Sequence, residues 1–371
     1  MAITTKVPAI ETYSPASGRI IGEDGLLYNI VDLLAGSGGG GGQPGPPGIS
    51  VNEKISIGTY GRNALYISQG STIILANGSP YTYTTNAIFG STNLDTGVFE
   101  VGSDYYIHVG AAGVILLSLA SAPPSGYRNV GGFHFGVIRT GTLPAAVNTG
   151  IVTRSVWTFQ DRPNCNPQGM VRLSGNLWVD IYLSSDDGNG GLTSKYLGIP
   201  VSGTESLNWY AAVDRLAKVG KRPLTYSEFV VVAAGSPPGT GSGNENAWSS
   251  ASERAPAGFV QNAVSNVGCR DCVGNLWEWQ GDIIASGIGE TPAWFDPMSA
   301  YGQGQVWLNA ANDFRAVLAG GSYFNGALIG ARSVCTLFSP WNDNPSFGVR
   351  GACESTTGEQ TYFVLPFDYE E

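Results

Sequence analysis

Charged side chains are scarce in this sequence. Asp, Glu, Lys and Arg make up only 13% of its 371 residues, and acidic residues outnumber basic ones, for a formal net charge of −10. A surface without excess positive charge cannot offset phosphate repulsion, which excludes a general nucleic-acid-binding role. Histidine is scarcer still, with only His108 and His134. Both lie in strand-like patterns, so we expect structural roles for them, and no Ser-His-Asp catalytic arrangement can be built on them.

Long apolar runs are also missing. No segment approaches the length that spans a bilayer, and the first residues lack the apolar core of a signal peptide. We therefore expect synthesis in the cytoplasm and no membrane insertion. Cysteine is too sparse and too irregularly spaced for a disulfide scaffold. Cys269 and Cys272 form a single Cys-x-x-Cys without a second pair or a nearby histidine to complete a zinc set, which favours a structural role, with a local disulfide as one form of it.

What the chain has in abundance is glycine, with 53 residues, and aromatic residues, at 11%. This composition is typical of strands and turns, and the chain is long enough to predict two or three domains. Residues 1–35 contain amphipathic pieces around an Asp-Gly turn signal, such as Arg19–Ile30. Because a lone hairpin is marginally stable, we expect this segment to be a small β trimerisation unit. Residues 36–49 form a Gly/Pro-rich linker with too few Gly-X-Y triplets to hold a triple helix.

Residues 50–150 are predicted to form an all-β sandwich, because short segments of alternating polarity are separated by turn residues. Residues 151–371 have an α+β pattern, in which Ser206–Gly220 has apolar residues at helical spacing and ends on a glycine. The loop Ala234–Asn246 is rich in Gly, Pro and Ser, so we expect it to be mobile. The alternating segments of the sandwich are Ala64–Ser68, Ser71–Ala76, Tyr81–Thr85, Tyr105–Val109 and Gly113–Leu117.

Short motifs in the last part of the chain occur in a specific order. Trp277 and Trp279 are two residues apart and therefore share one face of a predicted strand. Gly320 and Gly321 suit a tight backbone crossing, and Arg332 and Arg350 can fix loops through forked hydrogen bonds. Taken in order, the set resembles the formylglycine-generating-enzyme type of C-type lectin fold. The matching segments are Gly220–Phe229, Gly274–Trp279, Gly320–Tyr323, Gly330–Arg332 and Ser346–Ala352.

More of the chain is similar to one branch of that superfamily, the major tropism determinants of phages that carry a diversity-generating retroelement. With the lectin motifs, the matching segments cover roughly the last two thirds of the chain. The resemblance implies a homotrimeric receptor-binding protein at the tip of a virion tail fibre, with a host-cell surface receptor, protein or glycan, and other virion tail proteins as partners. It implies neither a cofactor nor an enzymatic activity. The segments are Asn129–Phe135, Trp157–Met170, Gly175–Leu183 and Thr193–Tyr196.

Two alternatives have some support in the residues. Formylglycine-generating enzymes are copper oxidases that use a cysteine pair between the Gly-Gly-Ser and Gly-Phe-Arg strands, but here that interval holds only Cys335, and Cys353 lies beyond it. Trp341-Asn-Asp343 is similar to the calcium strand of sugar-binding C-type lectins, yet no companion Glu-Pro-Asn loop is present, and calcium takes about six or more oxygen ligands. Both alternatives rank below the adhesin.

The resemblance also implies a variable region, at about residues 320–353. Retroelement mutagenesis of Asn codons of the form AAC or AAT cannot produce Lys, Gln, Glu, Met or Trp, so Trp341 is expected to be invariant. Phe324, Leu328, Leu337 and Phe338 are expected at exposed positions, where apolar anchors contribute most to an interface. Aligning the interval on its glycines and arginines predicts these variable, receptor-binding positions: Ser322, Phe324, Asn325, Leu328, Cys335, Leu337, Phe338, Asn342, Asn344 and Ser346.

Overall fold

The computed structural model describes residues 53–141, 147–285 and 314–355, together with the backbone of five short strands outside these ranges. The chain divides into two compact units, residues 1–50 and 51–371. In the first unit, β1 (Thr12–Ser14), β2 (Arg19–Ile21) and β3 (Leu27–Asn29) form an antiparallel meander. β2 and β3 lie on either side of the Asp-Gly signal, as the sequence predicts for a hairpin. In the second unit, β20 (Ala293–Phe295) pairs with β21 (Val306–Leu308).

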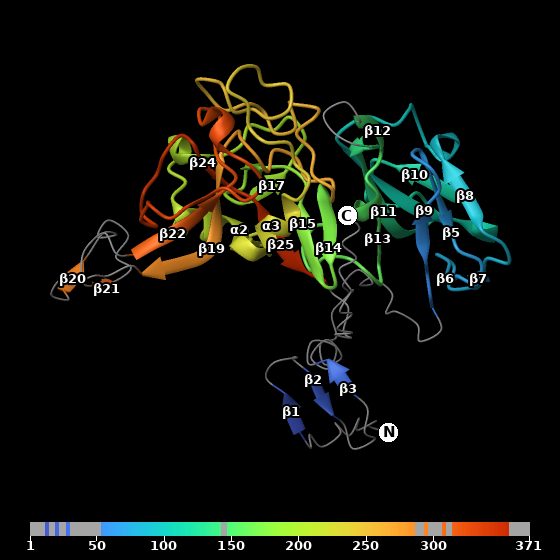
Figure 1. The fold of residues 1–371 in the computed structure, drawn as a ribbon. Coiled ribbons are helices and arrows are strands. Elements are labelled where there is room, and N and C mark those ends of the chain that lie inside the picture. Colours follow the sequence, from blue (N-terminus) through green and yellow to red (C-terminus); the bar gives the residue numbers. More distant parts are fainter. Residues whose placement is uncertain are drawn as a thin grey trace, which may run out of the picture. The chain divides into compact units, whose positions relative to one another are not determined.

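Strands between residues 57 and 158 surround one hydrophobic core (Figure 1). One sheet has the order β4-β5-β8, another the order β10-β9-β11-β12 with β13 also on β11, and β6 pairs with β7. Each of the five alternating segments predicted from the sequence overlaps a strand. The strands are β4 (Ile57–Thr59), β5 (Ala64–Ile67), β6 (Thr72–Ile74), β7 (Pro80–Thr82), β8 (Ala87–Gly90), β9 (Ser103–Val109), β10 (Ile115–Ser118), β11 (Arg128–Arg139), β12 (Val147–Ile151) and β13 (Trp157–Thr158).

The described residues after β13, here called the second region, are mostly β, with few helices. One sheet has the order β14-β15-β25-β18 and a second the order β23-β22-β19-β24, in which β19 and β24 are parallel and the other pairs antiparallel. A short hairpin joins β16 to β17. The strands are β14 (Met170–Ser174), β15 (Leu177–Asp180), β16 (Ser184–Asp186), β17 (Leu192–Ser194), β18 (Arg222–Pro223), β19 (Trp277–Ala285), β22 (Phe314–Ala319), β23 (Val334–Cys335), β24 (Phe347–Val349) and β25 (Gly351–Glu354).

Two α-helices are described, α2 (Trp209–Ala217) and α3 (Tyr226–Val232). The predicted helix is confirmed as α2, which begins after the N-cap Asn208, and Gly220 follows its end with a φ of 72°. The sequence analysis missed α3, although Thr225 and Glu228 form a capping box at its start. Single 3-10 turns occur at η1 (Ser91–Asn93), η2 (Ala111–Gly113), η3 (Thr153–Ser155), η4 (Gly203–Glu205) and η6 (Gly326–Leu328).

The motif residues form the scaffold of this second region, as predicted. Trp277 and Trp279 both pack on the same core cluster, and Trp279 is fully buried. Gly320 and Gly321 have positive φ, and a Cβ on Gly320 would lie 2.5 Å from the carbonyl oxygen of Cys272. The crossing therefore requires glycine at this position. Arg332 does not match the expectation of a forked contact, because its side chain is exposed and its carbonyl oxygen accepts the Tyr226 hydroxyl.

Buried ionic groups hold the centre of the second region. The Arg350 guanidinium binds both carboxylate oxygens of Glu278, at 3.0 and 2.8 Å, and also donates to three backbone carbonyls. Lys221 donates to the Asp180 carboxylate at 2.6 Å, and both of these side chains are buried. Paired and hydrogen-bonded charges of this kind fix the register of the strands that carry them. Among the described residues, no helix is both long and apolar enough to cross a membrane.

Both histidines have the structural roles expected of them. The ring of His108 is buried, and its Nε2 lies 3.1 Å from the carbonyl oxygen of Ala120. The ring of His134 lies between Asp104, at 3.0 Å, and the Tyr182 hydroxyl, at 2.9 Å. Tyr182 belongs to a separate hydrophobic core, here called the second core, which also contains Phe229 and Leu276. His134 therefore links β11 to the second core.

Candidate functional site

The segment Ser322–Ser346, here called the display loop, connects β22 to β24. Its start follows the Gly320-Gly321 crossing, and β23 within it pairs back on β22. Its end runs into β24, which lies beside β19. The loop is therefore held by the sheet at both ends and near its middle. Such anchoring lets a loop present side chains on a rigid frame.

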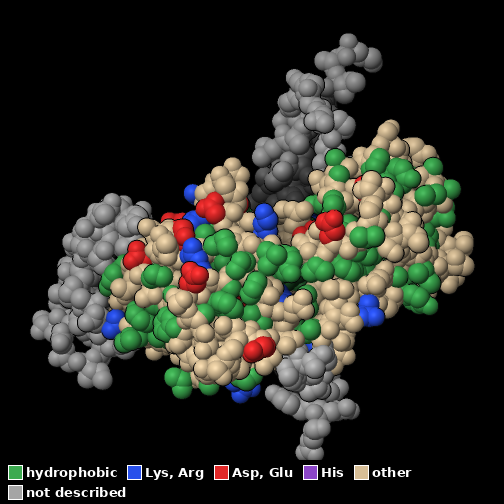
Figure 2. All heavy atoms as spheres, turned by 90° about the horizontal axis from the view of Figure 1, so that it is seen from above, with side chains coloured by type: hydrophobic (Ala, Val, Ile, Leu, Met, Phe, Trp, Pro, Cys, Tyr) green, Lys and Arg blue, Asp and Glu red, His purple; other side chains and the backbone are tan. Residues whose placement is uncertain are grey.

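Apolar side chains of the display loop project into solvent, and three of them lie at predicted variable positions. Phe324 is 57% exposed, Leu328 is 90% exposed and Leu337 is 66% exposed. Exposing three large apolar groups within one loop forgoes the free energy of burying them, which is typical of a surface that is covered in a complex. Figure 2 shows one face of the molecule, on which charged side chains are few and hydrophobic side chains are exposed in many places.

The ten predicted variable positions differ widely in exposure. Ser322 and Ser346 are buried, at 0% and 1% exposure, so their side chains cannot contact a partner directly in this conformation. The exposed positions are Phe324, Leu328, Leu337 and Asn342, and the half-buried ones are Asn325, Cys335, Phe338 and Asn344.

The three asparagines among these positions stabilise turns through side-chain to backbone hydrogen bonds. The Oδ1 of Asn325 accepts from the backbone N–H of Ser322 at 2.8 Å, and that of Asn344 accepts from the backbone N–H of Ser346 at 2.9 Å. Asn342 accepts from the N–H of Ser339 in the same way, at 2.8 Å. Side-chain caps of this kind fix short turns without regular secondary structure.

Phe338 corrects an expectation, because it is not an exposed anchor. Its ring is half-buried and meets the buried ring of Phe347 edge to face, with centroids 4.7 Å apart. It packs on the cluster that contains Trp279 and Leu318. The sequence could not distinguish it from Leu337, its neighbour, because only the path of the loop decides which of the two side chains points inward.

The loop Ala234–Asn246 and the residues after it are hydrogen-bonded to the display loop. The N–H of Gly239 donates to the carbonyl of Ile329 at 2.9 Å, and the N–H of Gly326 donates to the carbonyl of Ser249 at 2.7 Å. Ile329 is itself buried. These bonds tie residues 239–249 to the η6 part of the display loop, so the two segments form one supported surface.

Aromatic residues that the sequence analysis did not select extend this surface. Trp248 meets the half-exposed ring of Phe259 edge to face, at 5.6 Å between centroids. The backbone of Asn275 bonds to both Trp248 and Tyr323, which places these two residues on either side of it. Tyr323 in turn contacts Phe324 at 5.2 Å. The sequence could have pointed to these residues, because they are large aromatic residues within segments that are otherwise rich in Gly, Asn and Ser.

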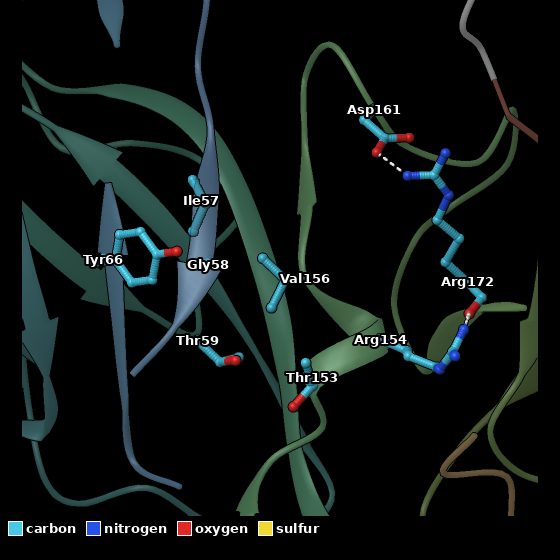
Figure 3. Close-up of a pocket in the computed structure, with 9 residues that line it drawn as sticks. All are labelled: Ile57, Gly58, Thr59, Tyr66, Thr153, Arg154, Val156, Asp161 and Arg172. Carbon is cyan, nitrogen blue, oxygen red and sulfur yellow. Dashed lines mark hydrogen bonds and ion pairs between the residues drawn. The ribbon is translucent and has the colours of Figure 1, made fainter. Parts of the chain in front are cut away.

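A second feature is a groove of about 440 Å³ beside η3 (Figure 3). Arg172 pairs with Asp161 on one side of it, and Arg154 donates to the carbonyl oxygens of residues 172 and 173, at 3.3 and 2.7 Å. These charged groups already have partners within the protein, and the groove lies between β4 and β5 on one side and η3 and β14 on the other. Its lining residues are Ile57, Gly58, Thr59, Tyr66, Thr153, Arg154, Val156, Asp161 and Arg172.

Comparison with known proteins agrees with this architecture. Residues 56–158 match the family model described as the Mtd second domain. The chain is 27% identical over 333 residues to the "Tail fiber receptor-binding protein" of Bordetella phage BPP-1, covering 82% of this chain and 84% of the relative. Its structure superposes on the Major Tropism Determinant P3c variant with a TM-score of 0.70, at 22% identity, covering 92% of this chain and 93% of that one. The chain has the major tropism determinant fold.

The I1 variant of the major tropism determinant gives a similar match, with a TM-score of 0.69 and 23% identity over 82% of this chain and 84% of that one. The resemblance to the major tropism determinants is thereby confirmed, and with it the C-type lectin fold. The relatives that match over most of the chain are named for receptor binding and tropism, and none of those named here is an enzyme.

The cysteines of this major tropism determinant-like chain do not form the pair that the oxidase alternative requires. Cys335 packs at the edge of the cluster around Trp279, whereas Cys353 belongs to a separate cluster around Trp178. In the Trp341-Asn-Asp343 motif of the calcium alternative, the Oδ1 of Asn342 accepts from the backbone N–H of Ser339. Over residues 53–141, 147–285 and 314–355, no group of three or more His, Cys, Asp or Glu side chains could hold a metal ion.

Proposed function

We propose that this protein is a phage tail-fibre adhesin that binds a receptor on the host-cell surface through the display loop. The observation that carries the proposal is the exposure of Phe324, Leu328 and Leu337 on a loop that is anchored at both ends. The receptor-binding tail fibre relative supports it. Receptor and adhesin associate by surface complementarity, and no bond is made or broken.

The division of labour within the loop follows from the contacts described above. Asparagines such as Asn325 and Asn342 hold the backbone through side-chain to backbone hydrogen bonds. The apolar side chains between them supply the contact area. Burying a fully exposed leucine contributes about 1.5–3 kcal/mol. A few such anchors give modest affinity for each head, and several heads on one fibre raise the overall affinity through effective concentration.

We propose further that a retroelement diversifies the region of about residues 320–353, as the predicted positions obey the codon rule for mutagenised Asn codons. Sequencing many progeny of the virus that encodes this chain tests this. We expect substitutions to concentrate at the ten positions, with Trp341 unchanged. Substitutions spread evenly over the chain would contradict diversification and leave an adhesin of fixed specificity.

The remaining organisation is also proposed. Residues 1–35 would form the trimerisation unit, 36–49 a linker, 50–150 the sandwich domain and 151–371 the receptor-binding domain, in a homotrimer attached to other virion tail proteins. The small β1-β2-β3 meander supports this, since a sheet of three short strands gains stability by packing on copies of itself. Multi-angle light scattering of the full chain should give three times the chain mass of 38.8 kDa. A monomer at micromolar concentration would rule out the trimer.

A further inference from the structure

Two cysteines far apart in the sequence meet across paired strands. Pro163 forms an antiparallel bridge with Ser355, and the N–H of Asn164 donates to the carbonyl of Glu354 at 2.8 Å. These contacts bring Cys165 next to Cys353, and both side chains pack in the same hydrophobic cluster. Facing residues on adjacent antiparallel segments have Cα atoms about 4.5–5.5 Å apart, which is within the range that a disulfide requires.

The environment of the pair distinguishes its two sulfurs. Cys353 is buried, at 1% exposure, while Cys165 is half-exposed, so an external reagent reaches Cys165 first. The neighbouring Cys165 side chain, with the backbone N–H groups of residues 164 and 165, lowers the pKa of Cys353 to about 7, whereas the neighbouring Cys353 and burial raise the pKa of Cys165. Both thiols are free in this structure.

We propose that Cys165 and Cys353 are a built disulfide site, which closes when the protein leaves the reducing cytoplasm and meets a small-molecule disulfide. The two cysteines share one proton, and when this proton lies on Cys353 the more exposed Cys165 thiolate attacks the small disulfide, forming a mixed disulfide and releasing one small thiolate. The Cys353 thiolate then attacks the Cys165 sulfur, and the second small thiol leaves. Overall, two protein thiols are oxidised to one disulfide and one small disulfide is reduced to two thiols, which take up the two protons.

The position of this disulfide explains what it would do. Cys165 lies in the segment between β13 and β14, and Cys353 lies on β25, which is paired on β15 and β18. A cross-link here joins the segment that leaves the first core to the central sheet of the second region. Because the closed loop is long, the cross-link removes much entropy from the unfolded chain. The virion protein would thereby gain stability outside the cell, with no effect on the display loop.

The other cysteines do not offer a comparable site. Cys269 and Cys272 are 0% and 1% exposed within the second core, so an oxidant cannot reach either sulfur without unfolding. Cys335 is half-buried and lies in a different cluster from Cys165. It is therefore a matched control, a partly accessible thiol without an opposing cysteine across its strand pair.

Oxidised glutathione and a reducing phosphine, applied to separate samples of the full wild-type chain, test the proposal. After oxidation we expect two of the five cysteines to be lost from a thiol count in denaturant, a Cys165–Cys353 peptide by mass spectrometry, and a Tm raised by about 5 °C or more. Cys335→Ser should also lose two thiols and show the same rise in Tm. Cys165→Ser should retain all of its thiols and show no rise.

Either of two results would overturn the proposal. One is a wild-type chain that keeps five thiols after oxidation while remaining folded. The other is a disulfide that maps to a different pair. The wild-type comparison decides the question even where a variant folds poorly, and because it does not use a receptor, its failure would leave the adhesin proposal untouched.

Discussion

Replacing Leu328 or Leu337 with alanine is expected to weaken attachment to the receptor by roughly 10- to 100-fold for each substitution, with the Tm almost unchanged. Leu328 is 90% exposed and Leu337 is 66% exposed, so both side chains contact mainly solvent in the free protein. Truncation therefore removes contact area with the receptor and little internal packing. Binding of the purified, labelled protein to susceptible cells, together with calorimetry, measures both effects.

Matched controls come from within the chain. Ile88 and Val114 are 54% and 55% exposed, but they lie in the first core region, away from the display loop. Alanine at either position should change neither binding nor Tm. Phe338→Ala should behave in the opposite way, with about 2–4 kcal/mol lost from the free energy of unfolding, since its ring packs on Phe347. Unchanged binding in both leucine variants would show that the receptor contacts another surface.

Replacing Arg350 with alanine is expected to cost about 3–5 kcal/mol of the free energy of unfolding, a large part of the stability of an ordinary domain. The substitution leaves the buried Glu278 carboxylate without its partner and three backbone carbonyls without their donor. Urea unfolding of purified protein measures the loss. Arg222→Ala is the matched control, since Arg222 pairs with Glu228 and Glu354 while 38% exposed, where an ion pair contributes about 0–1 kcal/mol.

The pH dependence of the Arg350→Ala variant provides an independent check. Burial already raises the pKa of the Glu278 carboxyl, and loss of Arg350 removes the main influence that lowers it. A folded-state pKa above the unfolded-state value means that the folded protein binds the proton more tightly. The stability of the variant should therefore increase as the pH falls through that folded-state pKa. A variant as stable as the wild type at neutral pH would contradict the central structural role of this ion pair.

The sequence predicted elements whose side chains follow a local rule. Strands such as Ala64–Ile67 follow period-two alternation, and α2 follows helical spacing with a polar cap before it and a glycine after it. The order of the lectin motifs predicted the C-type lectin fold, because each motif meets a need of the backbone, such as the Gly320 crossing. These features depend on residues that are close together in the chain.

What the sequence could not predict depends on the path of irregular segments. Phe338 and Leu337 are adjacent and chemically similar, yet one packs inward and the other faces solvent. Ser322 is buried although its neighbours in the display loop are not. The opposition of Cys165 and Cys353 arises from strand register between distant segments, and no local pattern encodes it.

The central claim is that this protein recognises a host-cell receptor through the display loop, and competition for phage adsorption tests it most directly. Susceptible cells would be incubated with the purified full chain before the virus that encodes it is added, and adsorption would be counted. We predict that the wild-type protein blocks adsorption in a saturable manner, while a folded variant with alanine at Phe324, Leu328 and Leu337 blocks it at least about 100-fold less effectively. Equal blocking by the two proteins, or none by either, would contradict the account.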